Sequence, residues 1–231
     1  MVALNRFDAE VVPGVKWGHS GLVPSPAYWA KLAAHADAEA DAYISSRDTP
    51  LIDDVIFCML GGFGIRMEVN KAAWEALKDA GVLDGRLVEA SEIETLLCKP
   101  LEIDGRKVRY RFPRQRSRRI AYAIRELKSH SPPTTCVNAF RKSLMRLPGI
   151  GPKTASWIAR NWLGSNDVAI LDVHVLRAGC IMGLFPTNYR LPNDYEALER
   201  RFLDFSAALG VAPSLLDALI WREMRIVGAM T

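Results

Sequence analysis

Cysteine is scarce in this 231-residue sequence, and the few that occur lie far apart: Cys58, Cys98, Cys136 and Cys180. Zinc sites place their cysteines a few residues apart, and small disulfide-stapled folds are dense in cysteine. The spacing here excludes both kinds of site. We therefore expect reduced thiols in a cytoplasmic protein.

We also find no segment typical of a secreted protein or of a membrane protein. The N-terminal stretch MVALNRFDAE lacks the basic and then apolar layout of a secretory signal peptide. The most apolar window, 55–60, is far shorter than the roughly 20 apolar residues that cross a bilayer. We find no internal repeat and no low-complexity tract. The sequence therefore predicts no membrane association.

What is present is enough apolar sequence for a folded core. With 49% hydrophobic residues, the chain can bury a sizeable core in one domain or two subdomains. The spacing of apolar residues and turn residues predicts an all-α fold. Helices are expected at 26–46, 50–60, 70–80, 91–98, 114–129, 135–146, 152–163, 173–182, 193–209 and 214–226.

The remaining segments add little regular structure. Residues 1–25 are expected to form an extended lead-in, and an Asp-Gly pair predicts a small β-hairpin at 101–108, at most one in the chain. We expect two helical subdomains, 61–146 and 1–60 with 147–231. The second should carry the candidate catalytic residues.

A turn rich in proline and glycine, LPGIG at 147–151, separates two of the expected helices. Pro148 stops the first helix, and Pro152 suits the first turn of the second. Gly149 and Gly151 allow a tight turn with positive φ and let another backbone come close. Such a turn points backbone N–H groups and a helix N-terminus at one place, which predicts a phosphate site.

Lys153 lies at the start of the second helix, and Asp172 follows 19 positions later (172 − 153), where another apolar helix begins. The segments IGPKTAS at 150–156 and AILDVHVLR at 169–177 together resemble the helix–hairpin–helix DNA glycosylase superfamily. The closest resemblance is to the compact archaeal-type 8-oxoguanine DNA glycosylase/AP lyases. It implies that Lys153 is the nucleophile and that Asp172 assists it. The four-cysteine iron–sulfur loop of some relatives has no counterpart here.

The chemistry of base excision suits these two residue types. A neutral lysine amine can attack C1′ and form a Schiff base, and a helix N-terminus and burial both favour the neutral amine. Asp172 can stabilise the positive charge that develops on the sugar and assist proton transfer. Two alternatives stay open: Lys153 only grips a phosphate, and Asp172 is a helix N-cap, with or without a catalytic role.

Positive charge is concentrated in one segment, although the net charge is only +4. Residues 106–119 hold eight basic side chains and no acidic one: Arg106, Lys107, Arg109, Arg111, Arg114, Arg116, Arg118 and Arg119. Clustered arginines favour contacts to the DNA backbone, here through Arg114, Arg116 and Arg118, which position a duplex without choosing a base. Alternatively, the segment is a solvated face. By resemblance His174 contacts a phosphate; otherwise it packs in the core.

A pocket for a flipped base needs flat surfaces and hydrogen-bond partners. Trp157 lies one helical turn after Lys153, and Asp217 and Trp221 are likewise one turn apart. The tryptophans could stack on the base, and an aspartate could accept from the N1–H and N2 amino groups of guanine. The matching positions line the base pocket in the family that the chain resembles. Alternatively, the tryptophans belong to the core, and Asp217 caps a helix with Ser214.

Two segments depart from the resemblance. In the loop GGFGIRMEV at 61–69, Phe63, Ile65 or Arg66 could fill the gap left by a flipped base, or the glycines only permit a turn. The lysine usual at the C-terminus of the archaeal-type class is replaced by Met230-Thr231.

We therefore expect a bifunctional DNA glycosylase/AP lyase for 8-oxoguanine. It should act as a monomer on double-stranded DNA containing a damaged base, without metal or redox cofactor. Two other hypotheses stay open: the same chemistry on another modified purine, and a helix–hairpin–helix module that binds DNA without catalysis.

Overall fold

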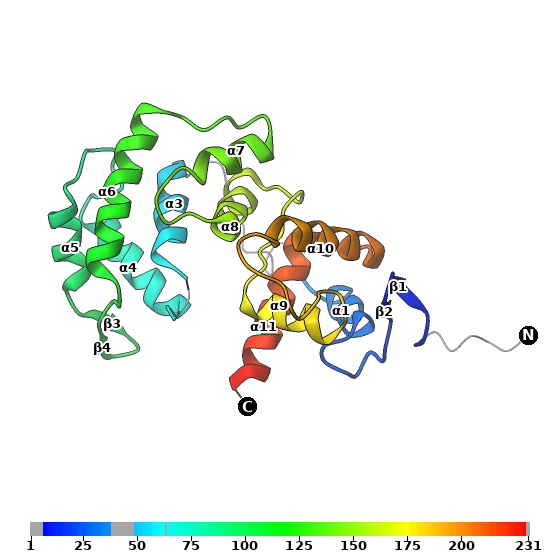
Figure 1. Cartoon of the computed structure of the whole chain (residues 1–231). Helices are drawn as coiled ribbons and strands as arrows, with labels where there is room; N and C mark the ends of the chain where they lie inside the picture. The colour runs from blue at the N-terminus through cyan, green and yellow to red at the C-terminus, as the bar shows by residue number, and fades with distance from the viewer. Residues whose placement is uncertain (1–6, 38–48, 63, 230–231) are drawn as a thin grey trace, which may run out of the picture. The chain divides into compact units, whose positions relative to one another are not determined.

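The computed structural model describes residues 7–37, 49–62 and 64–229, and the chain divides into two compact units (Figure 1). One unit is built from residues 45–163, and the other from residues 1–44 and 164–231. The part of the chain that is described contains ten α-helices and two short antiparallel strand pairs. The expected all-α fold is confirmed.

The 45–163 unit is built around α3 (Leu51–Leu60). Because α3 is apolar on nearly all sides, it becomes the buried centre, and it packs against α4, α6 and α8. The most extensive packing in this unit is between α5 and α6. Its other elements are α4 (Met67–Asp79), α5 (Ala90–Cys98), β3 (Leu101–Ile103), β4 (Arg106–Val108), α6 (Pro113–Ser129), α7 (Val137–Leu144) and α8 (Pro152–Leu163).

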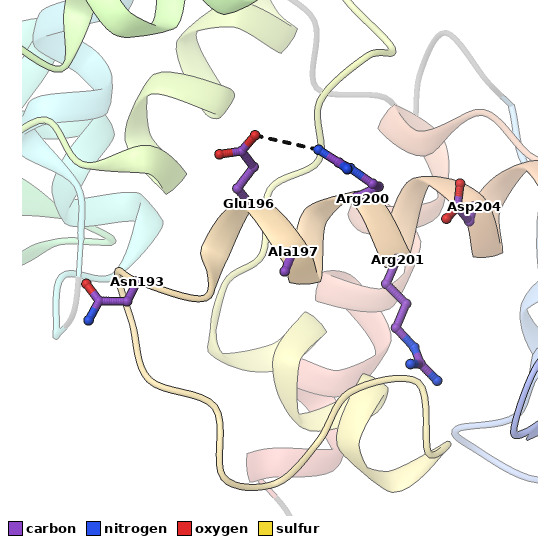
Figure 2. Close-up of a pocket in the computed structure, with 6 residues that line it drawn as sticks. All are labelled: Asn193, Glu196, Ala197, Arg200, Arg201 and Asp204. Carbon is purple, nitrogen blue, oxygen red and sulfur yellow. Dashed lines mark ion pairs between the residues drawn. The ribbon is translucent and has the colours of Figure 1, made fainter.

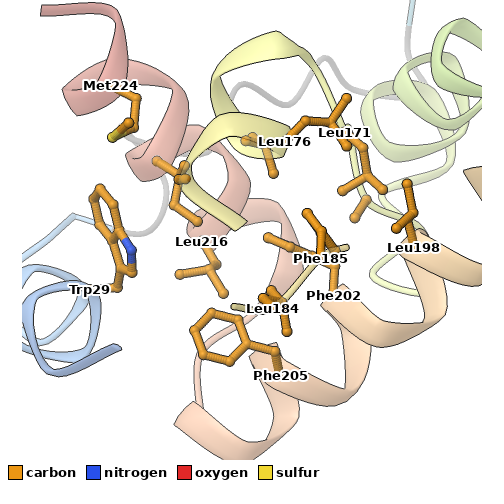
Figure 3. Packing of buried hydrophobic residues seen from close by; sticks show 14 of the residues in the cluster. Trp29, Leu171, Leu176, Leu184, Phe185, Leu198, Phe202, Phe205, Leu216 and Met224 are labelled. Carbon is orange, nitrogen blue, oxygen red and sulfur yellow. The ribbon is translucent and has the colours of Figure 1, made fainter. Parts of the chain in front are cut away.

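The second unit contains β1 (Glu10–Val12), β2 (Val15–Lys16), α1 (Pro26–Ala33), α9 (Val173–Ile181), α10 (Tyr195–Leu209) and α11 (Pro213–Ala229). Helix α11 packs against α1, α9 and α10. Figure 3 shows the apolar core that these helices share, which includes Trp29, Leu171 and Phe205. A Cβ at Gly179 would lie 2.1 Å from the Phe185 ring, so only glycine fits at that point of α9.

The structure departs from the expectations at several places. The hairpin expected at 101–108 is β3–β4, but a second pair, β1–β2, forms within the stretch expected to be extended. Gly14, with φ of +79°, provides its turn. The helix expected at 26–46 appears as α1, which ends at Ala33, and 38–46 lies outside the described residues.

The unit boundaries also differ from the expected ones. Grouping 1–60 with 147–231 would separate α3 from α4 and α6, whereas α3 packs on both of these helices as well as on α8.

The helices of the described ranges are short or carry charge. None of them alone is both long and apolar enough to cross a bilayer. Taken together, α10 and α11 have a sufficient length and composition, but the pair is bent by 100°.

Candidate active site and nucleic-acid interface

The turn before α8 has the geometry of a backbone anion site. Leu147 and Ile150 are buried, and the Ile150 N–H donates to the Leu147 carbonyl at 3.1 Å, which closes the turn. Within the described part of the chain, the N–H groups of Gly149 and Gly151 donate to no protein acceptor. Both are exposed beside the N-terminus of α8, where the helix dipole also favours an anion.

The two glycines of the turn differ in backbone conformation and in the space around them. Gly149 has φ of +92°, as expected, and a Cβ there would lie 2.7 Å from Cδ and Nη1 of Arg119. Gly151 has no positive φ, contrary to the expectation for both, and a Cβ there would meet nothing within 4 Å. Gly149 is therefore required by the fold, whereas Gly151 leaves open space in front of the helix.

Lys153 lies in the first turn of α8, half-buried. Its Nζ lies 5.5 Å from the centroid of the Trp157 ring, so the expected one-turn spacing does bring these side chains together. The Trp157 ring meets Phe57 edge-on at 5.9 Å, and Phe57 in turn meets Trp74. One wall of the candidate site is thus aromatic, with an amine over it.

Helix α3 borders this wall. Burial raises the pKa of the Cys58 thiol well above its usual value; the charge of Asp54 also raises it, and those of Lys153 and Arg160 lower it. A Cβ at Gly61 would lie 3.3 Å from both the Trp157 ring and Nδ2 of Asn70. Asn70 is buried, and its amide has no hydrogen-bond partner within the described residues. Sequence reasoning did not single out Asn70.

Asp172 is the N-cap of α9, which confirms the expected capping role. Its Oδ1 accepts hydrogen bonds from the backbone N–H groups of His174 and Val175, both at 2.9 Å. Its Oδ2 accepts none from the described residues. Cap formation therefore occupies one oxygen only, as the expected combination of a cap and a catalytic role requires. The imidazole of His174 is partly exposed, and its phosphate contact stays a prediction.

Asp217 makes a contact that the sequence did not suggest. The residue is 2% exposed, and its Oδ2 accepts from the Ile170 N–H at 2.8 Å. The Ser214 N–H, which a capping pair would have directed to Asp217, donates to Asn166 Oδ1 at 3.3 Å. Trp221, one turn along α11, is half-buried and has the Arg225 guanidinium 4.7 Å from its ring centroid.

The arginines of the basic segment lie in two kinds of environment. Arg114 and Arg118 are exposed on α6, as a DNA-contacting face requires. Arg116 is half-buried and donates from Nη2 to the Gly61 carbonyl at 2.9 Å, so it holds the loop that follows α3. Tyr110 donates to the neighbouring Leu60 carbonyl at 2.6 Å, and burial raises its pKa to about 12.

This packing explains the glycines of the 61–69 loop. A Cβ at Gly62 would lie 3.2 Å from Nη2 of Arg116, and one at Gly64 would lie 2.5 Å from Nη1 of Arg111. Glycine is therefore needed at these two positions, because arginine side chains pack directly against the backbone of the loop. Among the expected wedge residues, Ile65 is half-buried and Arg66 exposed, while Phe63 lies outside the described residues, as does the C-terminal pair 230–231.

A surface pocket lies elsewhere, on α10 (Figure 2). Its lining residues are Asn193, Glu196, Ala197, Arg200, Arg201 and Asp204, with an ion pair of 3.7 Å between Glu196 and Arg200. None of the predicted site residues lines it. Across the described ranges, no three histidine, cysteine or acidic side chains gather closely enough to hold a metal ion.

Comparisons with known proteins identify relatives of this chain. The 8-oxoguanine DNA glycosylase/AP lyase of Thermoplasma acidophilum is 37% identical over 76 residues, which make up 32% of this chain and 36% of that protein. The chain thus matches only about a third of that relative's length.

Solved structures match over most of the chain. The 8-oxoguanine DNA glycosylase of Methanocaldococcus jannaschii superposes with a TM-score of 0.61 at 23% identity, covering 84% of this chain and 86% of that one. The Thermotoga maritima 8-oxoguanine DNA glycosylase gives 0.56 at 24% identity, covering 84% of each. At such identities these likenesses show the fold. The family model described as 8-oxoguanine DNA glycosylase, Ogg-HhH, matches residues 40–211, and the chain belongs to this family.

Proposed function

We propose that this protein is a bifunctional DNA glycosylase/AP lyase that removes 8-oxoguanine from double-stranded DNA through a Schiff base on Lys153. The observation that carries the proposal is the position of Lys153, directly after a turn with open N–H groups and with its amine over the Trp157 ring. Family membership supports it, as does the M. jannaschii relative, whose crystal structure holds a 15mer DNA containing 8-oxoguanine.

In this proposal Lys153 attacks C1′ of the damaged nucleotide as a neutral amine. The bond from C1′ to the base breaks, its electron pair leaves with the base, and the base takes up a proton. Loss of the amine proton and opening of the sugar ring give the Schiff base. The Schiff base acidifies the C2′ proton, whose removal expels the 3′ phosphate and cleaves the strand.

Asp172 supplies electrostatic support in this scheme. Positive charge develops on the sugar as the base departs, and a carboxylate oxygen fixed nearby stabilises it. Oδ1 is held by the N-terminus of α9, so the carboxylate cannot rotate freely and Oδ2 is the oxygen that acts.

The duplex is held by backbone groups and arginines. The N–H groups of Gly149 and Gly151 at the start of α8 bind one phosphate, and the exposed Arg114 and Arg118 bind others. Arg116 contributes by fixing the loop after α3, in addition to any phosphate contact.

The flipped base stacks on Trp157 and Trp221 and is recognised by Asp217. The support for this part is the aromatic wall around Trp157 and the partial exposure of both rings. Oδ2 of Asp217 accepts from the Ile170 N–H, so the carboxylate that would recognise the base is held in place by the segment before Asp172.

A panel of duplexes, each with one defined lesion, tests the proposal. We expect base release and strand cleavage at 8-oxoguanine, and covalent trapping of the protein by borohydride. Lys153→Gln should abolish trapping while DNA affinity stays within about threefold, because binding rests mainly on phosphate contacts. Lys142→Gln, which removes a lysine of α7, is the matched control.

Three results would change the conclusion. Undiminished trapping by Lys153→Gln would place the nucleophile elsewhere. Duplex binding with neither release nor trapping on any lesion would indicate a DNA-binding module without catalysis. Faster release of a different modified purine would reassign the substrate and keep the mechanism.

A further inference from the structure

The segment that leads into Asp172 is buried but belongs to no helix or strand. Val168 and Ala169 are fully buried, and Leu171 is 1% exposed in the core that Figure 3 shows. Buried backbone N–H groups need acceptors, and an irregular segment cannot find them in a helix or sheet ladder. Their partners must come from elsewhere in the unit.

Side chains of α10 and α11 provide these partners. The Ala169 N–H donates to Glu199 Oε1 at 3.0 Å, and the Ile170 N–H donates to Asp217 Oδ2 at 2.8 Å. The next N–H, that of Leu171, donates to the hydroxyl of Tyr195 at 3.3 Å. Three consecutive N–H groups therefore each meet a side-chain oxygen.

Tyr195 makes a second bond to the same segment. Its hydroxyl donates to the Ala169 carbonyl at 2.8 Å, so one oxygen joins two peptide groups. Glu199 lies one turn further along α10 on the same face, and all three side chains are at most 3% exposed. Carboxylates that accept from N–H groups form stronger bonds than neutral acceptors. We call Tyr195, Glu199 and Asp217 the clamp.

We infer that the clamp holds Asp172 in its reactive position, and that Tyr195 and Glu199 are positioning residues for base excision. The inference rests on the proposed function. Asp172 is bonded through Oδ1 to α9 on one side, and its backbone continues the clamped segment on the other. A shift of the peptide at Leu171 would move the carboxylate, and a displacement of about 1 Å can cost a hundredfold in rate.

Removal of the Tyr195 hydroxyl is the direct test. Tyr195→Phe keeps the ring in the core but loses both bonds, so single-turnover release of 8-oxoguanine should slow by about tenfold to a hundredfold. Affinity for the lesion duplex should stay nearly unchanged, because the clamp is buried and bonds to the protein's own backbone. Tyr189→Phe, in the same unit and without a bond to the clamped segment, is the control. All rates are measured well below the melting temperatures.

A double variant separates positioning from general stability. If Tyr195 acts through Asp172, adding Tyr195→Phe to Asp172→Asn should slow release by much less than it slows the wild type. Glu199→Gln keeps an acceptor for the Ala169 N–H and should retain most of the rate, whereas Glu199→Leu should not. These two variants also test the clamp if Tyr195→Phe fails to fold.

The outcomes are distinguishable. Equal slowing by Tyr195→Phe in both backgrounds, or wild-type rates for Tyr195→Phe and Glu199→Leu, would overturn the clamp while leaving the glycosylase intact. A wild-type protein that releases no base from any lesion would overturn the proposed function, and the catalytic role of the clamp with it.

Discussion

Arg119 occupies the space that a side chain at Gly149 would need, since a Cβ there would lie 2.7 Å from the Cδ and Nη1 atoms of the arginine. The basic segment and the turn before α8 were inferred separately from the sequence, and this contact joins them. An arginine is thereby placed beside a backbone that offers open N–H groups. The two therefore lie side by side within the 45–163 unit, as a shared phosphate-binding surface would require.

The two glycines of the turn should respond differently to substitution. Gly149→Ala should destabilise the protein by roughly 1–3 kcal/mol, because alanine is strained at φ of +92° and its Cβ would collide with Arg119. Gly151→Ala should fold normally but bind duplex more weakly, since its Cβ would enter the space in front of α8. Thermal melting and duplex titration measure the two effects. Equal melting temperatures for both variants would contradict the assignment.

Asp172→Asn should separate the cap from the chemistry. Asparagine caps a helix about as well as aspartate, so the melting temperature should hardly change. Loss of the charge should slow base release by roughly a hundredfold or more. Asp172→Ala, which removes cap and charge together, should lose about 1 kcal/mol of stability as well. If Asp172→Asn releases the base at the wild-type rate, Asp172 is only a cap.

The arginines of α6 divide into two groups that salt dependence can tell apart. Replacing Arg114 and Arg118 by alanine should weaken binding to lesion and plain duplex by similar factors. The slope of log K against log salt should flatten by about 0.9 for each phosphate that the variant no longer neutralises. Arg125→Ala, at another exposed position of α6, is the control. An unchanged slope in the double variant would make the segment a solvated face.

Arg116→Ala should behave unlike the exposed pair. It removes the bond to the Gly61 carbonyl and leaves the glycine loop without its support, so stability should fall by about 1–3 kcal/mol. Thermal melting measures the change. An unaltered melting temperature would show that the loop does not depend on this arginine.

Features that depend on nearby residues were predictable from the sequence. The turn before α8, the cap at Asp172 and the pairing of Lys153 with Trp157 each involve residues within one or two turns of one another. Helical periodicity and turn chemistry determine such contacts. The second strand pair, at β1–β2, was missed because its strands are only three and two residues long, and the glycines and prolines of 1–25 favoured an extended lead-in.

Contacts between distant parts of the chain could not be predicted in the same way. Arg116 meets Gly61 across 55 positions, and Glu199 meets Ala169 across 30. No periodicity links such pairs, because the fold of each unit brings them together. The basic segment therefore suggested DNA contacts or a solvated face, and nothing in the sequence pointed to the bond between Glu199 and the Ala169 N–H.

Asp217 has two candidate roles: it accepts from the buried Ile170 N–H, and it is proposed to recognise the base. Two different substitutions can separate these roles. Asp217→Asn retains an oxygen that can accept from the Ile170 N–H, but it replaces one of the two acceptors that a guanine edge requires. If Asp217 recognises the base, Asp217→Asn should melt like the wild type and lose roughly 2–3 kcal/mol of preference for 8-oxoguanine over other flipped bases, the value of a hydrogen bond to a charged group.

Asp217→Ala removes both functions and should also lower the melting temperature, because the buried Ile170 N–H then lacks its acceptor. Trp221→Ala serves as the comparison, since loss of stacking should weaken excision of every flipped base by roughly 1–3 kcal/mol without changing the order of preference. If Asp217→Asn keeps the wild-type preference while Asp217→Ala is unstable, Asp217 belongs to the clamp alone, and recognition of guanine must come from another residue.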